Sequence, residues 1–481
     1  MWGSLALSPR ARRHGSAPAS KPVPVALSVA TASVLGCALF AGPAVATAAK
    51  TNAWTTPLSV ADAPAGVQAG LITRVGVTST GRGTVAWNVA GNGTIMSRDF
   101  TVGGTIAAPV TVTRGSLAAS VARDAAGNIV VSGQTAGSPA TSWVSTRKKD
   151  GTEYSFRALE SGPAVNAPAA FGLKTGFLVT ATNSFVPTTT AQGLPTAAAF
   201  GFLVGGTPVT VGKTLSGVET GDFAHGADGS NWALTSSGHA ISTGRRETGK
   251  PSKGKAPKSV AALIKVGKSP TRNSILGAER FGAGAVDTAG VAVAVAGLEV
   301  QQTADIAQRG IPVVALGTEE DDVVSLDETV EISGVDDRRA LEVDVAARAG
   351  GGAVVTWLQQ TSSKAENLQG QPKWAIVDDV GDIVARGAFS SATDAHDLRV
   401  VRAGPLALAI WTRGTGAKAK LYAARLDEDS ARIIKAPVGA PLGRLEGGLN
   451  TTQLTSNGRT VAVSFVDQAT NTVRVAIQTL K

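Results

Sequence analysis

Residues 342–357 read EVDVAARAGGGAVVTW, and they are followed by KWAIVDD from Lys373 and DIVARG from Asp382. This stretch contains four short apolar segments, EVDVAA, AVVTW, KWAIVDD and DIVARG, separated by glycine-rich or polar residues. Segments of this length, in which apolar residues tend to alternate, predict β-strands rather than helices. The last two strands are joined by DDVGD at 378–382, a composition typical of a hairpin turn. The stretch therefore predicts a unit of four antiparallel strands.

Similar units recur along the chain at intervals of roughly 50 residues. The eight copies are RVGVTSTGRGTVAWNV from Arg74, ASVARDAAGNIVVSG from Ala119, PAAFGLKTGFLVTA from Pro168, DFAHGADGSNWALT from Asp222, GAGAVDTAGVAVAVAG from Gly282, EVDVAARAGGGAVVTW from Glu342, DLRVVRAGPLALAIW from Asp397 and TQLTSNGRTVAVSF from Thr452. A repeat of this length with four strands is the signature of a β-propeller blade. We therefore expect an all-β chain forming a single β-propeller of eight four-stranded blades. Seven blades, tandem β-sandwiches and a β-solenoid are the alternatives.

The two ends of the repeat region complement each other. Outer strands of two units carry proline, an apolar residue, threonine and valine, at Pro109–Val112 and Pro208–Val211. A similar pattern, WTTPLSV, stands at 54–60, whereas the last unit offers only three strands and ends near Lys481. Proline is tolerated on an edge strand, because that strand has no partner on one side. We expect the N-terminal strand to complete the last blade.

The sequence resembles the secreted β-propeller repeat proteins of high-GC bacteria, whose units read as a Gly-Asn turn, a Val/Ala/Trp strand and a Trp-x-x-Pro outer strand. The resemblance covers nearly all of residues 50–481. WD dipeptides, kelch glycine pairs and strict Asp boxes are missing, so no named propeller family follows from it.

Residues 1–49 have the features of a secretory signal peptide. Four basic residues and no acidic one precede an uncharged run from Val23 to Ala49, which ends in A-x-A patterns at 44–48. We expect cleavage between about Ala46 and Ala49. The alternatives are an uncleaved membrane anchor and lipidation of Cys37, which follows Val34-Leu35-Gly36. These expectations place the protein outside the cell or on the bacterial surface.

Charge is concentrated in two segments. Residues 244–272 form a basic insertion, which we expect to be an exposed loop over its first part, GRRETGKPSKGKAPK. Residues 319–337 are acidic and lack basic side chains. The basic side chains could bind anionic envelope polymers through salt-dependent contacts, or they could have no partner at all. The candidate ligand-binding residues are Arg245, Arg246, Lys250, Lys253, Lys255 and Lys258.

Catalytic signatures are scarce in the sequence. The mature histidines His225, His239 and His396 have no metal-binding spacing, and nucleophile-elbow, P-loop and calcium-loop patterns are absent. A sialidase-like site needs a tyrosine beside a glutamate. Tyr154 follows Glu153, but adjacent residues of a strand point to opposite faces, so the pair could not share one pocket.

Tryptophans allow two interpretations. Three of them occupy the same strand position in their units and are expected in the packing between blades, namely Trp87, Trp357 and Trp411. Three others could instead stack on sugar rings from an exposed face, namely Trp54, Trp143 and Trp374.

The sequence favours an exported, non-catalytic binding or scaffolding propeller at the bacterial cell surface. It would contact an envelope polymer or an extracellular protein, without a metal or another cofactor and without nucleic acid. The alternative is a secreted carbohydrate-active enzyme resembling sialidases, which would require two carboxylates, or a tyrosine and a glutamate, to converge with arginines. Glu153, Asp222 and Asp397 are the acidic candidates for such a site.

Overall fold

The computed structural model describes most of the chain beyond residue 53, with gaps at many connections. The described residues are 54, 57–62, 73–89, 93–135, 140–159, 164–172, 176–189, 195–204, 215–219, 232–234, 239–245, 259–265, 280–286, 292–299, 310–320, 323–327, 330–332, 340–360, 369–414, 419–435, 453–467 and 472–479. The expected signal peptide lies outside them. Every regular element in the described part is a β-strand. No helix there has the length and apolar composition needed to cross a membrane.

The strands form antiparallel sheets that follow one another along the sequence. Two of them are β2 (Thr73–Val77), β3 (Arg82–Val89), β4 (Thr94–Thr101) and β5 (Val110–Thr113), then β6 (Ser116–Arg123), β7 (Ile129–Thr135), β8 (Ser142–Arg147) and β9 (Ser155–Ala158). Two more are β22 (Ala340–Ala347), β23 (Ala353–Gln359), β24 (Gln371–Val377) and β25 (Ile383–Ala388), then β26 (Ala395–Ala403), β27 (Leu406–Arg413), β28 (Lys420–Asp427) and β29 (Arg432–Lys435). In each of these sheets, neighbours in sequence are neighbours in space.

Both faces of a sheet are covered by adjacent sheets. Along β23, Val355 and Trp357 pack against the preceding sheet, whereas Val354 and Leu358 pack against the following one. The alternation of side chains along a strand therefore decides which neighbouring sheet a residue contacts, and the whole strand is buried. A series of four-stranded sheets packed face to face in this way is a propeller-type architecture.

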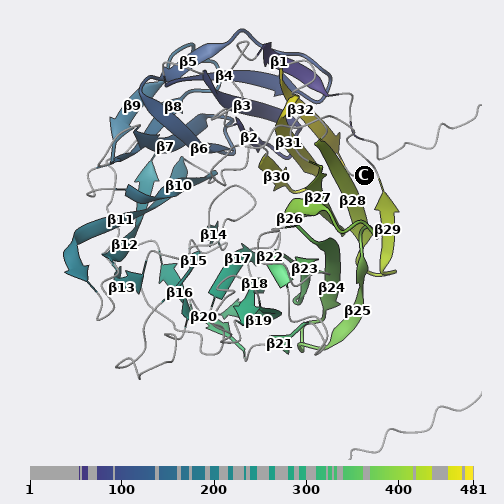
Figure 1. The fold of residues 1–481 in the computed structure, drawn as a ribbon. Coiled ribbons are helices and arrows are strands. Elements are labelled where there is room, and N and C mark those ends of the chain that lie inside the picture. Colours follow the sequence, from purple (N-terminus) through teal and green to yellow (C-terminus); the bar gives the residue numbers. More distant parts are fainter. Residues whose placement is uncertain are drawn as a thin grey trace, which may run out of the picture. The chain divides into compact units, whose positions relative to one another are not determined.

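The expected pairing of the two ends is confirmed. β1 (Leu58–Asp62) lies antiparallel to β32 (Thr472–Thr479) and completes a sheet with β31 (Thr460–Asp467) and β30 (Gln453–Asn457) (Figure 1). The register shifts at Val60, so this residue forms a bulge and leaves the regular ladder. Arg98 of β4 donates from its Nη1 to the Val60 carbonyl oxygen.

The middle of the chain departs from the expected blade pattern. One seven-stranded sheet contains β10 (Ala164–Gly172), β11 (Phe177–Thr189), β12 (Pro195–Val204), β13 (Leu215–Glu219), β14 (Trp232–Leu234), β15 (His239–Arg245) and β16 (Ser259–Lys265). Among the described residues, its two halves are joined by the single pair Glu219 and Arg245, and the fourth unit contributes three strands rather than four. A five-stranded sheet follows, made of β17 (Arg280–Val286), β18 (Ala292–Glu299), β19 (Ile311–Glu320), β20 (Val323–Leu326) and β21 (Val330–Glu331).

The loop expected from Gly244 is wrong for its first two residues, because Gly244 and Arg245 belong to β15. Residues 259–265 form β16 beside it, and residues 246–258 lie outside the described residues. The acidic segment contributes the end of β19 and the strands β20 and β21. Strand pairing outweighs the glycine and charge content, because a hairpin partner satisfies the backbone groups.

Candidate functional site

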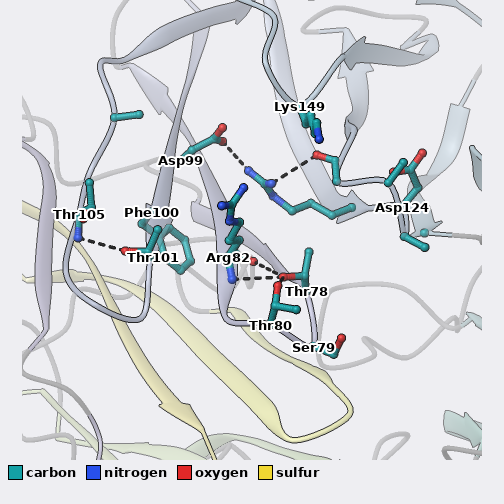
Figure 2. Close-up of a pocket in the computed structure, with 16 residues that line it drawn as sticks. Thr78, Ser79, Thr80, Arg82, Asp99, Phe100, Thr101, Thr105, Asp124 and Lys149 are labelled. Carbon is teal, nitrogen blue, oxygen red and sulfur yellow. Dashed lines mark hydrogen bonds and ion pairs between the residues drawn. The ribbon is translucent and has the colours of Figure 1, made fainter.

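A cleft of about 770 Å³ opens where the sheet of β2–β5 meets the sheet of β6–β9 (Figure 2). It is bordered by the β2–β3 turn, the end of β4 with its following loop, the β6–β7 turn, the β8–β9 connection and the end of β10. The lining residues are Thr78, Ser79, Thr80, Arg82, Asp99, Phe100, Thr101, Thr105, Ala107, Arg123, Asp124, Ala125, Ala126, Gly127, Lys149 and Gly172. This volume suits a small-molecule site.

Asp99 is held in a charged network at the cleft. Its Oδ1 accepts from Arg147 Nη2 at 2.7 Å, from Arg123 Nη2 at 2.9 Å and from Thr84 Oγ1 at 2.7 Å. The Arg123 guanidinium is buried and also donates to Thr84 Oγ1 and to the Gly83 and Gly127 carbonyls. Two guanidinium groups therefore neutralise Asp99 on one oxygen. The other oxygen, Oδ2, has no partner among the described residues.

Asp124 shapes the β6–β7 turn. Its carboxylate accepts from the Asn128 backbone N–H and side-chain amide, both at 2.8 Å, and from the Gly176 N–H at 3.3 Å. The turn ends at Gly127, whose φ of 87° is in the left-handed region that suits glycine. Asp124 is thus a structural carboxylate with three donors.

Arg82 is the cation of the cleft that lacks a partner. Its backbone is fixed by Thr78, whose Oγ1 accepts from the Arg82 N–H and donates to its carbonyl, both at 3.1 Å. The side chain extends into the cleft in Figure 2. Among the described residues its guanidinium has no hydrogen-bond or ion-pair partner. Lys149, in the β8–β9 connection, is exposed, and its ammonium lies 3.9 Å from Asp150 Oδ2.

Tyr154 and Glu153 do not form a catalytic pair. The Tyr154 hydroxyl is 3.0 Å from Ser97 Oγ, and the ring lies 5.1 Å from the Arg147 guanidinium carbon. Burial raises the pKa of this phenol above its ordinary value. Glu153 is exposed to solvent. The two side chains are separated as expected, although they lie in a connection before β9 and not in a strand.

A second group of charges lies where β22 and β26 meet. His396 is buried rather than on the surface, with Nδ1 2.6 Å from Asp397 Oδ2 and Nε2 2.9 Å from the Gly414 carbonyl oxygen. Glu342 Oε2 accepts from the Leu398 N–H at 3.0 Å. Burial raises the pKa of Glu342, and the charge of Asp397 raises it further.

These carboxylates share an unusual backbone geometry. Glu342 and Asp397 both have positive φ, 47° and 57°, at corresponding bulges of their strands. Each bulge interrupts the hydrogen-bond ladder of its strand. Beside the bulge of β26, the Leu398 N–H donates to the Glu342 carboxylate. We interpret this group as a junction between two sheets. Asp222 lies outside the described residues.

Five tryptophans of the described residues are buried in the packing between sheets. The expectation for Trp87, Trp357 and Trp411 is confirmed, since all three are buried between sheets. The sugar-stacking interpretation is wrong for Trp143 and Trp374, which are buried as well. Wide apolar surfaces of neighbouring sheets cover these rings. Trp54 is partly buried against the cluster that contains Leu454.

Most of the basic residues predicted to bind a ligand lie outside the described residues. Arg245 ends β15, and its side chain is not described. Arg246, Lys250, Lys253, Lys255 and Lys258 lie outside the described residues, as do His225 and the segment 208–211. Within the described residues, no group of three histidine, cysteine, aspartate or glutamate side chains could hold a metal ion.

Sequence reasoning missed the cleft, although its turns TSTGR (78–82) and DAAGN (124–128) were visible as parts of the first two units. The available signal was a polar turn with a glycine and an arginine in the first unit, followed by a similar glycine turn in the second unit.

Comparisons with known proteins give likeness of fold alone. No protein-family model matches the chain, and no curated protein is similar to it in sequence. Among solved structures, Sqt1 of Chaetomium thermophilum bound to the N-terminus of ribosomal protein L10 has a TM-score of 0.48 and 9% identity, covering 88% of this chain and 100% of that one. The α-L-arabinanase of Penicillium chrysogenum has a TM-score of 0.40 and 10% identity, covering 89% and 98%. The Aleuria aurantia lectin has a TM-score of 0.37 and 11% identity, covering 78% and 98%.

Proposed function

We propose that this protein is an exported, non-catalytic binding propeller of eight blades, and that the cleft between its first two blades holds a hydroxyl-rich ligand at the bacterial cell surface. The pairing of β1 with β32 supports closure of the last blade by the first strand. The single-residue junction between β13 and β15 supports counting the seven-stranded sheet as two blades.

The state of the cleft carboxylates carries the proposal for binding over hydrolysis. General acid and base catalysis on a glycosidic bond needs two carboxyl groups free to exchange protons with the substrate. Asp99 is held by two arginines, and Asp124 is held by three N–H donors. Among the described lining residues, the cleft therefore offers one open carboxylate oxygen, Asp99 Oδ2, and not two open carboxyl groups, whereas threonine and serine hydroxyls and Arg82 remain for binding.

A blocking variant tests the cleft. Ala125 is exposed in the β6–β7 turn, and Ala349 holds the corresponding place in the β22–β23 turn. Purified protein would be screened against envelope polysaccharides and oligosaccharides, with product analysis by chromatography. We expect Ala125→Trp to abolish binding and Ala349→Trp to preserve it, without products in either case. Release of shortened sugars by the parent protein, lost in Ala125→Trp, would support the hydrolase alternative.

Export rests on the leader and needs its own test. The protein would be expressed in a high-GC Gram-positive host, and the mature N-terminus would be sequenced. We expect release into the medium or onto the cell surface, with a new N-terminus between about Ala46 and Ala49. Retention of Met1 in a membrane fraction would indicate an uncleaved anchor, and an N-terminal lipidated Cys37 would indicate a lipoprotein.

A further inference from the structure

We propose that the ligand of the cleft is an acidic saccharide, in which a carboxylate or phosphate group is bound by Arg82 while neighbouring hydroxyls contact Asp99 and the threonine-rich turn. This inference rests on the proposed function, because it specifies the ligand of the same cleft.

Charge balance around the cleft favours an anion. Asp99 is already neutralised by Arg123 and Arg147, and Asp124 receives three backbone or amide donors. The donors of Asp124 are neutral, but Arg123 and Arg147 together carry one positive charge more than Asp99, which offsets the Asp124 carboxylate. Arg82 is left as a cation without a counter-charge among the described residues. Lys149 adds a second exposed positive charge from the β8–β9 connection of the next sheet. An anion that enters between them gains attraction from two blades at once.

The guanidinium of Arg82 suits an oxyanion better than a neutral sugar. Its planar fork donates two parallel hydrogen bonds to a carboxylate or phosphate, which are stronger than bonds to a neutral oxygen. Two hydrogen bonds with Thr78 Oγ1 hold the Arg82 backbone in place. Arg82 therefore loses less conformational freedom when it binds a ligand.

The remaining lining indicates a sugar rather than a bare anion. Asp99 Oδ2 has no partner among the described residues and is placed to accept from a ligand hydroxyl. Ser79 and Thr105 add hydroxyl groups at the border of the cleft. A cluster of donors and an acceptor within one cleft matches the alternating hydroxyls of a saccharide.

The described residues that line the cleft present no exposed aromatic ring, which argues against a neutral sugar. Phe100, the one aromatic residue of the cleft lining in the described structure, is only 2% exposed and packs in the core. Neutral sugars commonly gain affinity by stacking an apolar ring face on an aromatic side chain. Without such a platform, charge recognition by Arg82 must supply much of the affinity.

The test compares ligands matched in size and differing in charge. Isothermal titration calorimetry at low salt would use the purified protein with a galacturonate trimer, a galactose trimer and a galactose trimer phosphorylated on its 6-hydroxyls. We expect the galacturonate or the phosphorylated oligomer to bind at least tenfold more tightly than the galactose oligomer. The preferred one of the two acidic probes identifies carboxylate or phosphate as the source of the charge.

Variants separate the anion from the cleft itself. Arg82→Gln should weaken acidic-ligand binding by about tenfold to a hundredfold, and Arg82→Lys should restore part of it. Arg157→Gln, which removes an exposed charge from β9 outside the cleft, should have no effect.

Two outcomes would contradict the inference. If the galactose oligomer binds as tightly as the acidic ones, and Arg82→Gln changes nothing while Ala125→Trp still abolishes binding, the cleft is a saccharide site and its acidic selectivity is wrong. If acidic oligomers bind equally to Ala125→Trp, or fail to bind at all, the assignment of the ligand to this cleft is wrong as well.

Discussion

Replacement of Val60 by alanine tests whether β1 packs beside β32 as the fourth strand of the last sheet. Val60 is fully buried, and it belongs to the cluster that contains Val75, Val473 and Val475. Its side chain thus connects the sheet of β30–β32 to the sheet of β2–β5. The substitution removes two methyl groups and leaves a small cavity.

The magnitude follows from transfer and cavity energies. About 0.8 kcal/mol per buried carbon, with an added cavity penalty, gives a loss of roughly 2–3 kcal/mol. The unit from Asn52 to Lys481 has about 430 residues. At about 2.1 cal/mol/K per residue, its entropy of unfolding is near 0.9 kcal/mol/K, so the expected fall in Tm is about 3 °C.

Differential scanning calorimetry measures this shift, and hydrogen exchange of the β32 amides measures docking directly. Val380→Ala is the matched control, because Val380 is 77% exposed in the β24–β25 turn. It should leave Tm within about 0.5 °C of the parent value. A Val60→Ala protein that melts like the control, with β32 amides that exchange rapidly in both proteins, would refute the docking of β1.

Three further substitutions probe the site and its support. Gly172→Ala should lower Tm by several degrees and weaken cleft binding, since an added Cβ would lie 1.7 Å from the Arg123 carbonyl oxygen; an unchanged Tm in calorimetry would contradict this close approach. Asp99→Asn should destabilise the protein by about 3 kcal/mol in urea unfolding, because Arg123 would then remain buried without a full counter-charge; a loss below about 0.5 kcal/mol would argue against the network. Glu342→Gln should raise Tm at pH 7 and flatten its dependence on pH. The raised pKa of Glu342 means that its carboxyl favours folding below the ordinary value of 4.5 and that this stability is lost as pH rises through the folded pKa; a Tm of the parent that does not fall over this range would be inconsistent with the raised pKa.

The fold could be predicted to a large extent because its signals are local. The hairpin at 378–382 was visible as DDVGD, and the structure closes it with the Asp378 N–H bonded to the Asp382 carbonyl at 2.9 Å and a Gly381 φ of 91°. Complementary ends also predicted the pairing of β1 with β32. The seven-stranded sheet could not be predicted, because its two halves are joined by the single pair Glu219 and Arg245, and neither residue belongs to the repeat stretches at 168–181 and 222–235.

The cleft could not be predicted because it is non-local. Arg82 begins β3, Asp99 lies in β4 and Lys149 lies in the β8–β9 connection, and no spacing rule joins them. The same reason explains the error for Trp143. From the sequence alone its ring could have stacked on a sugar, but in the structure the neighbouring sheet covers it. Residue type indicated which chemical groups the side chains carry, whereas packing between sheets decided which of these side chains a ligand can reach.

Closure and the cleft are also physically connected. Thr105 and Ala107 line the cleft, while Ile106 between them packs against the hydrophobic cluster that contains Val60 of β1. Side chains of successive residues in an extended loop point to opposite sides, so one short segment faces the ligand with one side and the N-terminal strand with the other. The guanidinium of Arg98 adds a hydrogen bond from β4 to the Val60 carbonyl. The free energy that docks β1 is therefore shared with the wall of the cleft, and β1 supports the geometry on which the proposed recognition of a ligand depends.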